Sequence, residues 1–303
     1  MAASYSPIPY TGNKACIAAD LISFIPKHIT YMEPCAGSAE IFFRKAPSPR
    51  EILNDYSNDV VNLYRTMQCE EKLLMLLGRL CLSISSEELF KRNKEYLESI
   101  PNVLDDLNET VDEIKNATEA NIEQAAAFIE NQVYSFSSTG QSYGIEARDM
   151  AKRINRFIAA RSRIANACIL HRDYKDAMIY AADENTFYLI DPPYRKTENS
   201  YPKGNFSSEE FRQLIRLVAE LDRKYGVKFI ITYNTDPDMI ELAQSYGFQT
   251  KVLDRLDGMR QATDPGSQYH ELLIANYDME AQAEKNRGIV ISKTNQMTLF
   301  GSE

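Results

Sequence analysis

Short apolar segments alternate with segments of helical spacing in two parts of the chain. Near the start, residues 29–33 and 51–55 have the pattern of strands, and a helical pattern follows each. The second half continues this alternation, and its strand-like segments are 168–170, 187–190, 228–233, 251–253 and 271–275. Strands that alternate with helices favour an α/β domain. We therefore predict a mostly parallel sheet with helices on both faces.

About 100 residues of helical sequence separate the first two β/α units from the others. This stretch has breaks at 83–86 and at Pro101, and a loop rich in Gly, Ser and Tyr at 134–144. The simplest arrangement is a discontinuous sheet domain, residues 1–65 and 166–278, that carries a helical insert at 66–165. Residues 279–303 are polar and irregular, which predicts a flexible tail.

The composition is that of an ordinary globular protein. Of the 303 residues, 44% are hydrophobic and 25% are charged. A chain of this length suits about two domains. The cysteines are odd in number, widely spaced and never in a C-x-x-C pattern: Cys16, Cys35, Cys69, Cys81 and Cys168. This argues against a disulfide framework and a zinc cluster, and the three histidines are scattered, so we expect no metal site. Without a signal-peptide pattern or an apolar run of about 18 residues, we expect a cytoplasmic protein with no membrane segment.

The charge is unevenly distributed along the chain. The net charge is −9, yet residues 87–130 hold 12 acids and four bases, whereas residues 145–172 hold seven bases and two acids. On a helix over 147–165, four basic side chains fall within about 80° of arc: Arg148, Lys152, Arg156 and Arg163. Apolar side chains lie opposite: Met150, Ile154, Phe157, Ile158 and Ile164. The stripe is either an ordinary solvated face or a contact for phosphates, and we favour the phosphates.

The tetrapeptide Asp191-Pro-Pro-Tyr194 ends an apolar strand. Two prolines cannot continue a strand ladder, so the chain turns there, at the sheet edge where ligands of α/β proteins bind. The turn offers the carboxylate of Asp191, the carbonyls of Pro192 and Pro193, and the ring of Tyr194. Such a set can accept hydrogen bonds from an amino group while it stacks on a planar ring. The alternative is a strand-ending turn with a packed tyrosine.

Two further features suit a cofactor with a ribose. Glu33-Pro-Cys-Ala-Gly37-Ser-Ala39 is a strand, a small-residue turn and a helix start, where a glycine lets a ligand approach the backbone. Asp55 ends the next strand about 20 residues later, a position suited to ribose hydroxyls. The alternatives are close strand–helix packing for Gly37 and a helix N-cap for Asp55.

Together with Tyr10-Thr-Gly-Asn-Lys14, these motifs resemble those of Dam-like (D12 class) DNA adenine-N6 methyltransferases, over roughly residues 7–278. The resemblance implies a class I methyltransferase (Rossmann-like) fold and S-adenosylmethionine as cofactor. It also implies cofactor contacts from residues that match the motifs: Tyr10, Lys14, Glu33, Gly37, Asp55, Asp173, Tyr174 and Asp191. Two positions depart from the family, since Ala39 and Asn13 stand where glycines are common. A methyl group at Ala39 is tolerated if its φ is negative.

The resemblance further implies site-specific methylation of double-stranded DNA. The target adenine flips out, stacks on Tyr194, and donates its amino hydrogens to Asp191 and the Pro192 carbonyl. Methyl transfer is then direct, without a Cys or Ser nucleophile. The alternatives are a related enzyme acting on cytosine N4, RNA or a protein glutamine, and a DNA-binding module of this fold that has lost catalysis.

The final residues contain a last candidate motif. Gln296, followed by Leu299 and Phe300, resembles the peptide that docks on the bacterial sliding clamp of DNA replication. A disordered segment could insert the two apolar side chains into a pocket of that partner. The alternative is that they fold back onto the protein's own surface.

Overall fold

Seven strands form one sheet in the computed structural model, which describes residues 5–10, 12–105, 120–144, 150–193, 206–256 and 268–288. The strand order is β3-β2-β1-β4-β5-β7-β6. In chain order the strands are β1 Thr30–Glu33, β2 Arg50–Asn54, β3 Cys168–Leu170, β4 Thr186–Ile190, β5 Lys228–Asn234, β6 Gln249–Leu256 and β7 Gln268–Ala275. Strands β1 to β5 pair in parallel, and β7 is antiparallel to both β5 and β6. The predicted mostly parallel sheet is therefore confirmed.

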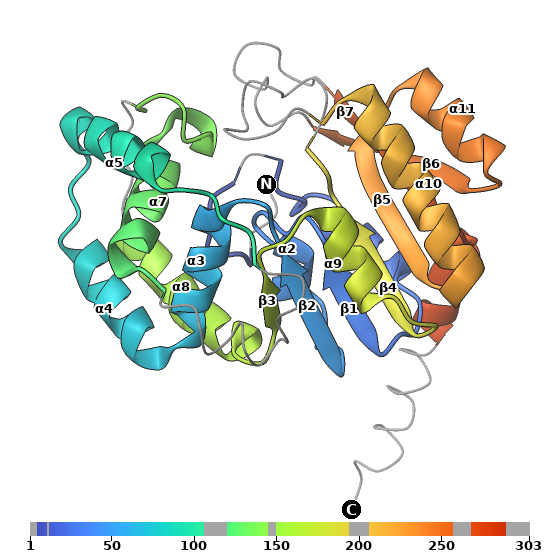
Figure 1. The fold of residues 1–303 in the computed structure, drawn as a ribbon, viewed down its shortest axis with the longest axis horizontal. Helices are drawn as coiled ribbons and strands as arrows, with labels where there is room; N and C mark the ends of the chain where they lie inside the picture. Colours follow the sequence, from blue (N-terminus) through green and yellow to red (C-terminus); the bar gives the residue numbers. More distant parts are fainter. Residues whose placement is uncertain are drawn as a thin grey trace, which may run out of the picture.

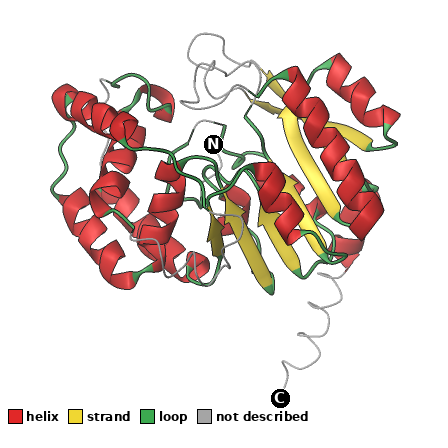
Figure 2. Ribbon diagram, in the orientation of Figure 1, coloured by secondary structure: helices red, strands yellow, loops and turns green. Residues whose placement is uncertain are grey.

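Helices cover both faces of the sheet (Figures 1 and 2). One face packs against α9 Tyr174–Ala181, α10 Ser208–Tyr225 and α11 Pro237–Ser245, and the other against α1 Ala18–Phe24 and α2 Glu40–Arg44. Strand β4 is buried throughout, because Phe187 and Leu189 enter one core while Tyr188 and Ile190 enter the other. An all-apolar strand is what a sheet covered on two faces requires.

Local sequence explains the helices of the second half. The hydroxyl of Ser207 caps α10 by accepting from the amide of Glu210, and Gly226 ends the helix with φ 73°. The helices α1 and α9 were not predicted, since they have only seven and eight residues and show little of the helical period.

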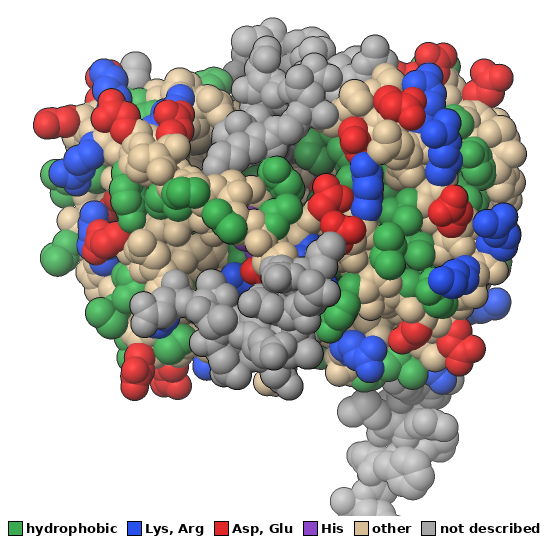
Figure 3. All heavy atoms as spheres, in the orientation of Figure 1, with side chains coloured by type: hydrophobic (Ala, Val, Ile, Leu, Met, Phe, Trp, Pro, Cys, Tyr) green, Lys and Arg blue, Asp and Glu red, His purple; other side chains and the backbone are tan. Residues whose placement is uncertain are grey.

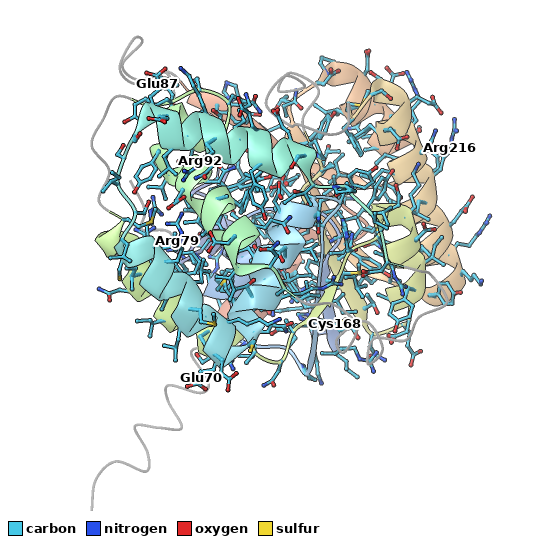
Figure 4. The ribbon with its side chains drawn as sticks, turned by 60° about the vertical axis from the view of Figure 1, so that its left-hand side comes forward. Glu70, Arg79, Glu87, Arg92, Cys168 and Arg216 are labelled. Atoms are coloured by element: carbon cyan, nitrogen blue, oxygen red, sulfur yellow. The ribbon has the colours of Figure 1, made fainter. Side chains whose placement is uncertain are left out.

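The helical part consists of α3 Asn58–Gln68, α4 Glu70–Cys81, α5 Glu87–Ser99, α7 Ile122–Tyr134 and α8 Ala151–Ile164. Helix α7 lies at its centre, where Glu130 is fully buried and accepts a hydrogen bond from Arg79 of α4 (labelled in Figure 4) at 3.0 Å. Buried side chains of α3, α4, α7 and α8 join the core of one sheet face in a single cluster. The predicted boundary at residue 66 falls inside α3, and the bounds of the insert stay a prediction.

The prediction of a flexible tail from residue 279 is wrong for its first part. Residues 279–288 are helical, and Met279 and Ala283 are buried. The amide of Asn286 donates to the carbonyls of Ser23 (2.7 Å) and Ile25 (3.0 Å) at the end of α1. Residues 289–303, which include Gln296, Leu299 and Phe300, lie outside the described residues. Within the described ranges, no helix is long and apolar enough to cross a membrane.

Candidate active site

A cavity of about 940 Å³ opens at the carboxyl ends of the parallel strands, between the sheet and the helical part. Side chains from both parts line it, including Phe128 and Gln132 of α7. The structure brings most of the predicted site residues together there, and these are Tyr10, Lys14, Glu33, Gly37, Asp55, Asp173, Tyr174, Asp191 and Pro193. Residues that are far apart in the sequence thus share one site, as parallel strands that end at the same edge require.

The turn after β1 needs a glycine at residue 37. Gly37 has a φ of +47°, and a Cβ built on it would lie 3.4 Å from the ring of Tyr10. Its amide donates to Asp55 (2.8 Å), and its carbonyl accepts from the hydroxyl of Tyr64 (2.6 Å). These contacts hold the turn open toward the cavity, where a bulkier residue would meet Tyr10.

Ala39 does not have the negative φ on which we based its tolerance. Its φ is +48° and its ψ +39°, the left-handed region, directly before α2. A side chain with a Cβ is strained in this conformation by about 1–2 kcal/mol. The glycine that the resemblance leads us to expect there would carry no such strain.

Asp55 connects the turn to the second strand. One carboxylate oxygen accepts from the amide of Gly37 and the other from the amide of Ser57, both at 2.8 Å. Burial raises the pKa of this carboxyl, and the amides of Ser57 and Gly37 oppose the rise. Asp55 therefore fastens the turn, but it is not the N-cap of α3, which is Ser57. The ribose contact stays a prediction.

Glu33 ends β1 and faces the cavity. The hydroxyl of Tyr31 (2.7 Å) and the amide of Phe42 (2.9 Å) both donate to its Oε1. Burial raises the pKa of Glu33 to about 7, although these two hydrogen bonds act in the opposite direction. The carboxyl can therefore change its charge near neutral pH.

Asp191 sits at the end of β4 with both carboxylate oxygens engaged. Lys14 Nζ lies 2.6 Å from Oδ2, and the hydroxyl of Thr232 donates to Oδ1 at 2.8 Å. The Asp191 side chain is still 33% exposed, and it lines the cavity. Pro193 lines the cavity too, whereas Pro192 is buried and is not among the lining residues. Tyr194 lies outside the described residues.

Asp173 and Tyr174 border the cavity at the start of α9. Asp173 caps that helix by accepting from the amide of Lys175 (2.9 Å), and the Tyr174 hydroxyl donates to Glu210 at 3.2 Å. Burial, and then the charge of Glu210, raises the pKa of Tyr174. Sequence reasoning missed Phe206 and Glu210, which also line the cavity.

Residues 10–258 match the family described as D12 class N6 adenine-specific DNA methyltransferase. The chain belongs to this family.

Three relatives illustrate the similarity. The DNA N-6-adenine-methyltransferase of Escherichia phage P1 is 25% identical over 80% of this chain and 32% of its own length. The type II methyltransferase M1.LlaDCHI of Lactococcus lactis subsp. cremoris is 22% identical over 88% of this chain and 94% of its own. The modification methylase StsI of Streptococcus sanguinis is 20% identical over 90% of this chain and 43% of its own length. The chain thus spans about a third of the length of the phage protein. Its mostly parallel, seven-stranded sheet is consistent with a class I methyltransferase fold.

One cysteine of this D12-class site is poorly suited to act as a nucleophile. Burial raises the pKa of the Cys35 thiol, and the charges of Asp55, Asp191 and Asp173 raise it further. A neutral thiol is a weak nucleophile compared with a thiolate. Among the residues that the structure describes, no group of three or more His, Cys, Asp or Glu could hold a metal ion.

The basic stripe of this D12-class chain is not arranged as predicted. Arg163 turns inward, where it pairs with Glu51 of β2 and lies 4.0 Å over the ring of Phe42, and its side chain is only 13% exposed. Ile158, expected to be buried, is 57% exposed. Arg163 is therefore a structural residue and not a phosphate contact.

The other members of the stripe are described in part. Arg156 is partly exposed on α8, whereas Arg148 and the side chain of Lys152 lie outside the described residues. None of the described α8 side chains lines the cavity. On the face in Figure 3, acidic and basic side chains are interspersed along α10, where Arg212 and Arg216 lie 3.7 and 3.5 Å from Glu209.

Proposed function

We propose that this protein transfers a methyl group from S-adenosylmethionine to the N6 amino group of a flipped adenine, at a specific site in double-stranded DNA. The observation that carries the proposal is the position of Asp191. Its carboxylate is fixed at both oxygens, yet opens into a cavity that also holds the glycine turn. Membership of the D12 class supports adenine as the target.

The residues of the cavity fit S-adenosylmethionine. Gly37 leaves a space beside the Tyr10 ring that a side chain would fill, and the carboxylate of Asp55 lies next to this space. Glu33 and Asp173 add further carboxyl groups, which suit a ligand that carries positive charge. When bound, the cofactor supplies a methyl group on a positively charged sulfur.

The chain's own residues orient the amino group. The nitrogen of adenine N6 is a poor nucleophile because its lone pair is delocalised into the ring. When the amino group donates a hydrogen bond to the Asp191 carboxylate, the direction of that N–H bond is fixed, and the nitrogen lone pair then points at the methyl carbon. The C–N bond forms as the S–C bond breaks, and the displaced amino proton passes to water. The Pro192 carbonyl as second acceptor and the stacking on Tyr194 complete the proposal.

Exchange of Asp191 tests the proposal. We expect Asp191→Ala to lower transfer of tritiated methyl to adenine in duplex DNA by at least about a hundredfold, since it removes the group that polarises the nucleophile. Asp183→Ala is the control, because Asp183 precedes the amino end of β4 and its side chain is partly exposed there. Wild-type rates of N6-methyladenine formation in Asp191→Ala would refute the assignment. Products at cytosine N4, RNA or protein glutamine would favour the related enzymes instead.

The alternative outside the enzymes is a DNA-binding module of this fold that has lost catalysis. Calorimetry separates the two readings, because an intact cofactor site binds S-adenosylmethionine and a lost one does not. The contacts of Tyr10, Lys14, Asp55 and Asp191 within one cavity support the enzyme.

For DNA we retain Lys152 and Arg156 as phosphate contacts, together with Arg148, and drop Arg163. Lys152→Ala with Arg156→Ala should weaken binding to every duplex and reduce its dependence on salt. An unchanged salt dependence would mean that these side chains face solvent and do not contact DNA phosphates.

For the segment around Gln296 we retain the sliding clamp as partner, by resemblance alone. A peptide spanning residues 293–303 should bind the clamp with a Kd on the order of micromolar, and Leu299→Ala with Phe300→Ala should abolish this. If the peptide with both substitutions still binds the clamp, the proposed docking of Leu299 and Phe300 is wrong.

A further inference from the structure

Three polar residues share one sheet face at the edge where the cavity opens. Asp191 follows β4, Thr232 lies on β5 and Glu271 lies on β7, and these strands are neighbours. Asn234 pairs with Glu271 and Thr232 with Leu273, so Thr232 and Glu271 project from the same side. Asn234 is a further buried polar residue of this side, whereas Leu189, Ile230 and Leu273 are apolar and belong to one core cluster. Burial of polar groups in such surroundings is costly without partners.

The hydroxyl of Thr232 forms a hydrogen bond with Asp191. The residue is fully buried, and Oγ1 donates to Asp191 Oδ1 at 2.8 Å. A hydrogen bond to a charged acceptor is stronger than one between neutral groups. Because β5 is a rigid central strand, this bond sets the rotation of the carboxylate about its side chain.

Glu271 acts on Asp191 through Lys14. Glu271 is fully buried, and its Oε1 lies 3.6 Å from Lys14 Nζ. The ammonium group is nearly buried, lies 2.6 Å from Asp191 Oδ2, and donates to the Gly12 carbonyl at 3.0 Å. Lys14 thus lies between two carboxylates. Glu271 holds the ammonium in place and balances part of its charge, which leaves Asp191 a better acceptor.

We propose that Thr232 and Glu271 are positioning residues for methyl transfer, which fix the orientation and the acceptor strength of Asp191. The inference rests on the proposed function. Thr232 acts through Asp191, beside which it lines the cavity, and Glu271, which is not among the lining residues, acts through Lys14. Their loss should slow the chemical step in the assembled complex more than it weakens the binding of cofactor or DNA.

The test compares variants that keep shape and change one polar group. Thr232→Val should lower the single-turnover rate at saturating cofactor and duplex by about tenfold, since the carboxylate loses one fixed contact. Thr232→Ser should restore the rate to within about threefold of wild type, because it keeps the hydroxyl. Thr186→Val is the control: Thr186 is equally buried, donates to the Ala181 carbonyl at 2.7 Å, and lies at the opposite end of β4.

Glu271→Gln is the second variant. We expect a rate about fivefold below wild type, with a cofactor Kd changed by less than about threefold, because the charge balance at Lys14 changes while the shape stays. The control is Glu130→Gln, a fully buried carboxylate in the helical part.

The outcomes separate this inference from the proposed function. A wild-type rate in Thr232→Val or Glu271→Gln, an equal loss in Thr232→Ser, or an equal loss in the controls would overturn the positioning roles. A wild-type protein that methylates no adenine would overturn the proposed function itself.

Discussion

Two buried ion clusters lie on the same face of the sheet at opposite edges. Lys14, Asp191 and Glu271 meet at the carboxyl edge, and Lys45, Glu51 and Arg163 meet at the amino edge. In the first, one cation is shared by two carboxylates. In the second, one carboxylate is shared by two cations, which also rest on aromatic rings: Lys45 on Tyr31 and Arg163 on Phe42.

The clusters differ most in their access to a ligand. The side chains of Lys45, Glu51 and Arg163 are 4, 7 and 13% exposed, whereas Asp191 is 33% exposed toward the cavity. Burial alone would raise the pKa of Glu51, but hydrogen bonds from Arg163 and Lys45 outweigh it and the pKa is lowered. Similar ionic groups thus form a closed cluster at one edge of the sheet and, at the other edge, a cluster in which one carboxylate can reach a ligand.

The largest effect should come from opening the closed cluster. Glu51→Gln should lower the free energy of unfolding by about 3 kcal/mol, because two buried cations lose their countercharge. The transfer rate per folded molecule should stay unchanged, since the site lies at the other edge. Urea unfolding and single-turnover assays measure the two quantities.

Glu280→Gln is the matched control for Glu51. Glu280 pairs with Lys251, but its side chain is 58% exposed, so the expected loss is below about 1 kcal/mol. Equal losses in the two variants would contradict the distinction between buried and exposed pairs.

Burial is the main cause of the raised pKa of Glu33, and both clusters act on it as well, since the charge of Asp191 raises this pKa and that of Lys45 lowers it. Its folded pKa of about 7 lies above the ordinary value of 4.5, so folding favours the protonated form. This stabilisation is complete below about pH 4.5 and is lost as the pH rises to about 7, by roughly 3 kcal/mol in all. Glu33→Gln, which mimics the protonated form, should remove that loss. Urea unfolding from about pH 5 to about pH 8 checks this, and parallel curves for the two proteins would contradict it.

The smallest effect concerns the turn beside the open cluster. Ala39→Gly should stabilise the protein by about 1 kcal/mol, because glycine relieves the left-handed strain at some cost in chain entropy. Ala36→Gly is the control, since Ala36 is buried in the same turn without a positive φ. Urea midpoints measure both variants, and a loss at Ala39 as large as that at Ala36 would contradict the strain.

The sequence predicted the mostly parallel sheet, and most of its predicted site residues lie in one cavity, because strand ends and motifs are local features. It did not predict the inward turn of Arg163, since helical periodicity takes no account of Glu51, the residue of β2 with which Arg163 pairs. The conformation of Ala39 was missed because alanine itself carries no signal of a positive φ. Sequence analysis did not single out Thr232 or Glu271, because only the pairing of β5 with β7 places them on one side, where Thr232 contacts Asp191 and Glu271 faces Lys14.

The last part of the described chain closes on its beginning. The hydroxyl of Tyr277 donates to the carbonyl of Phe24, and Asn286 holds Ser23 and Ile25, so α1 is tied down by residues about 250–260 positions later. Lys14, only four residues before α1, must also find Asp191 across 177 positions. Contacts this distant in sequence form late in folding. In a chain that still lacks residues 277–286, α1 is therefore not tied down, and we expect the pairing of Lys14 with Asp191 to form late.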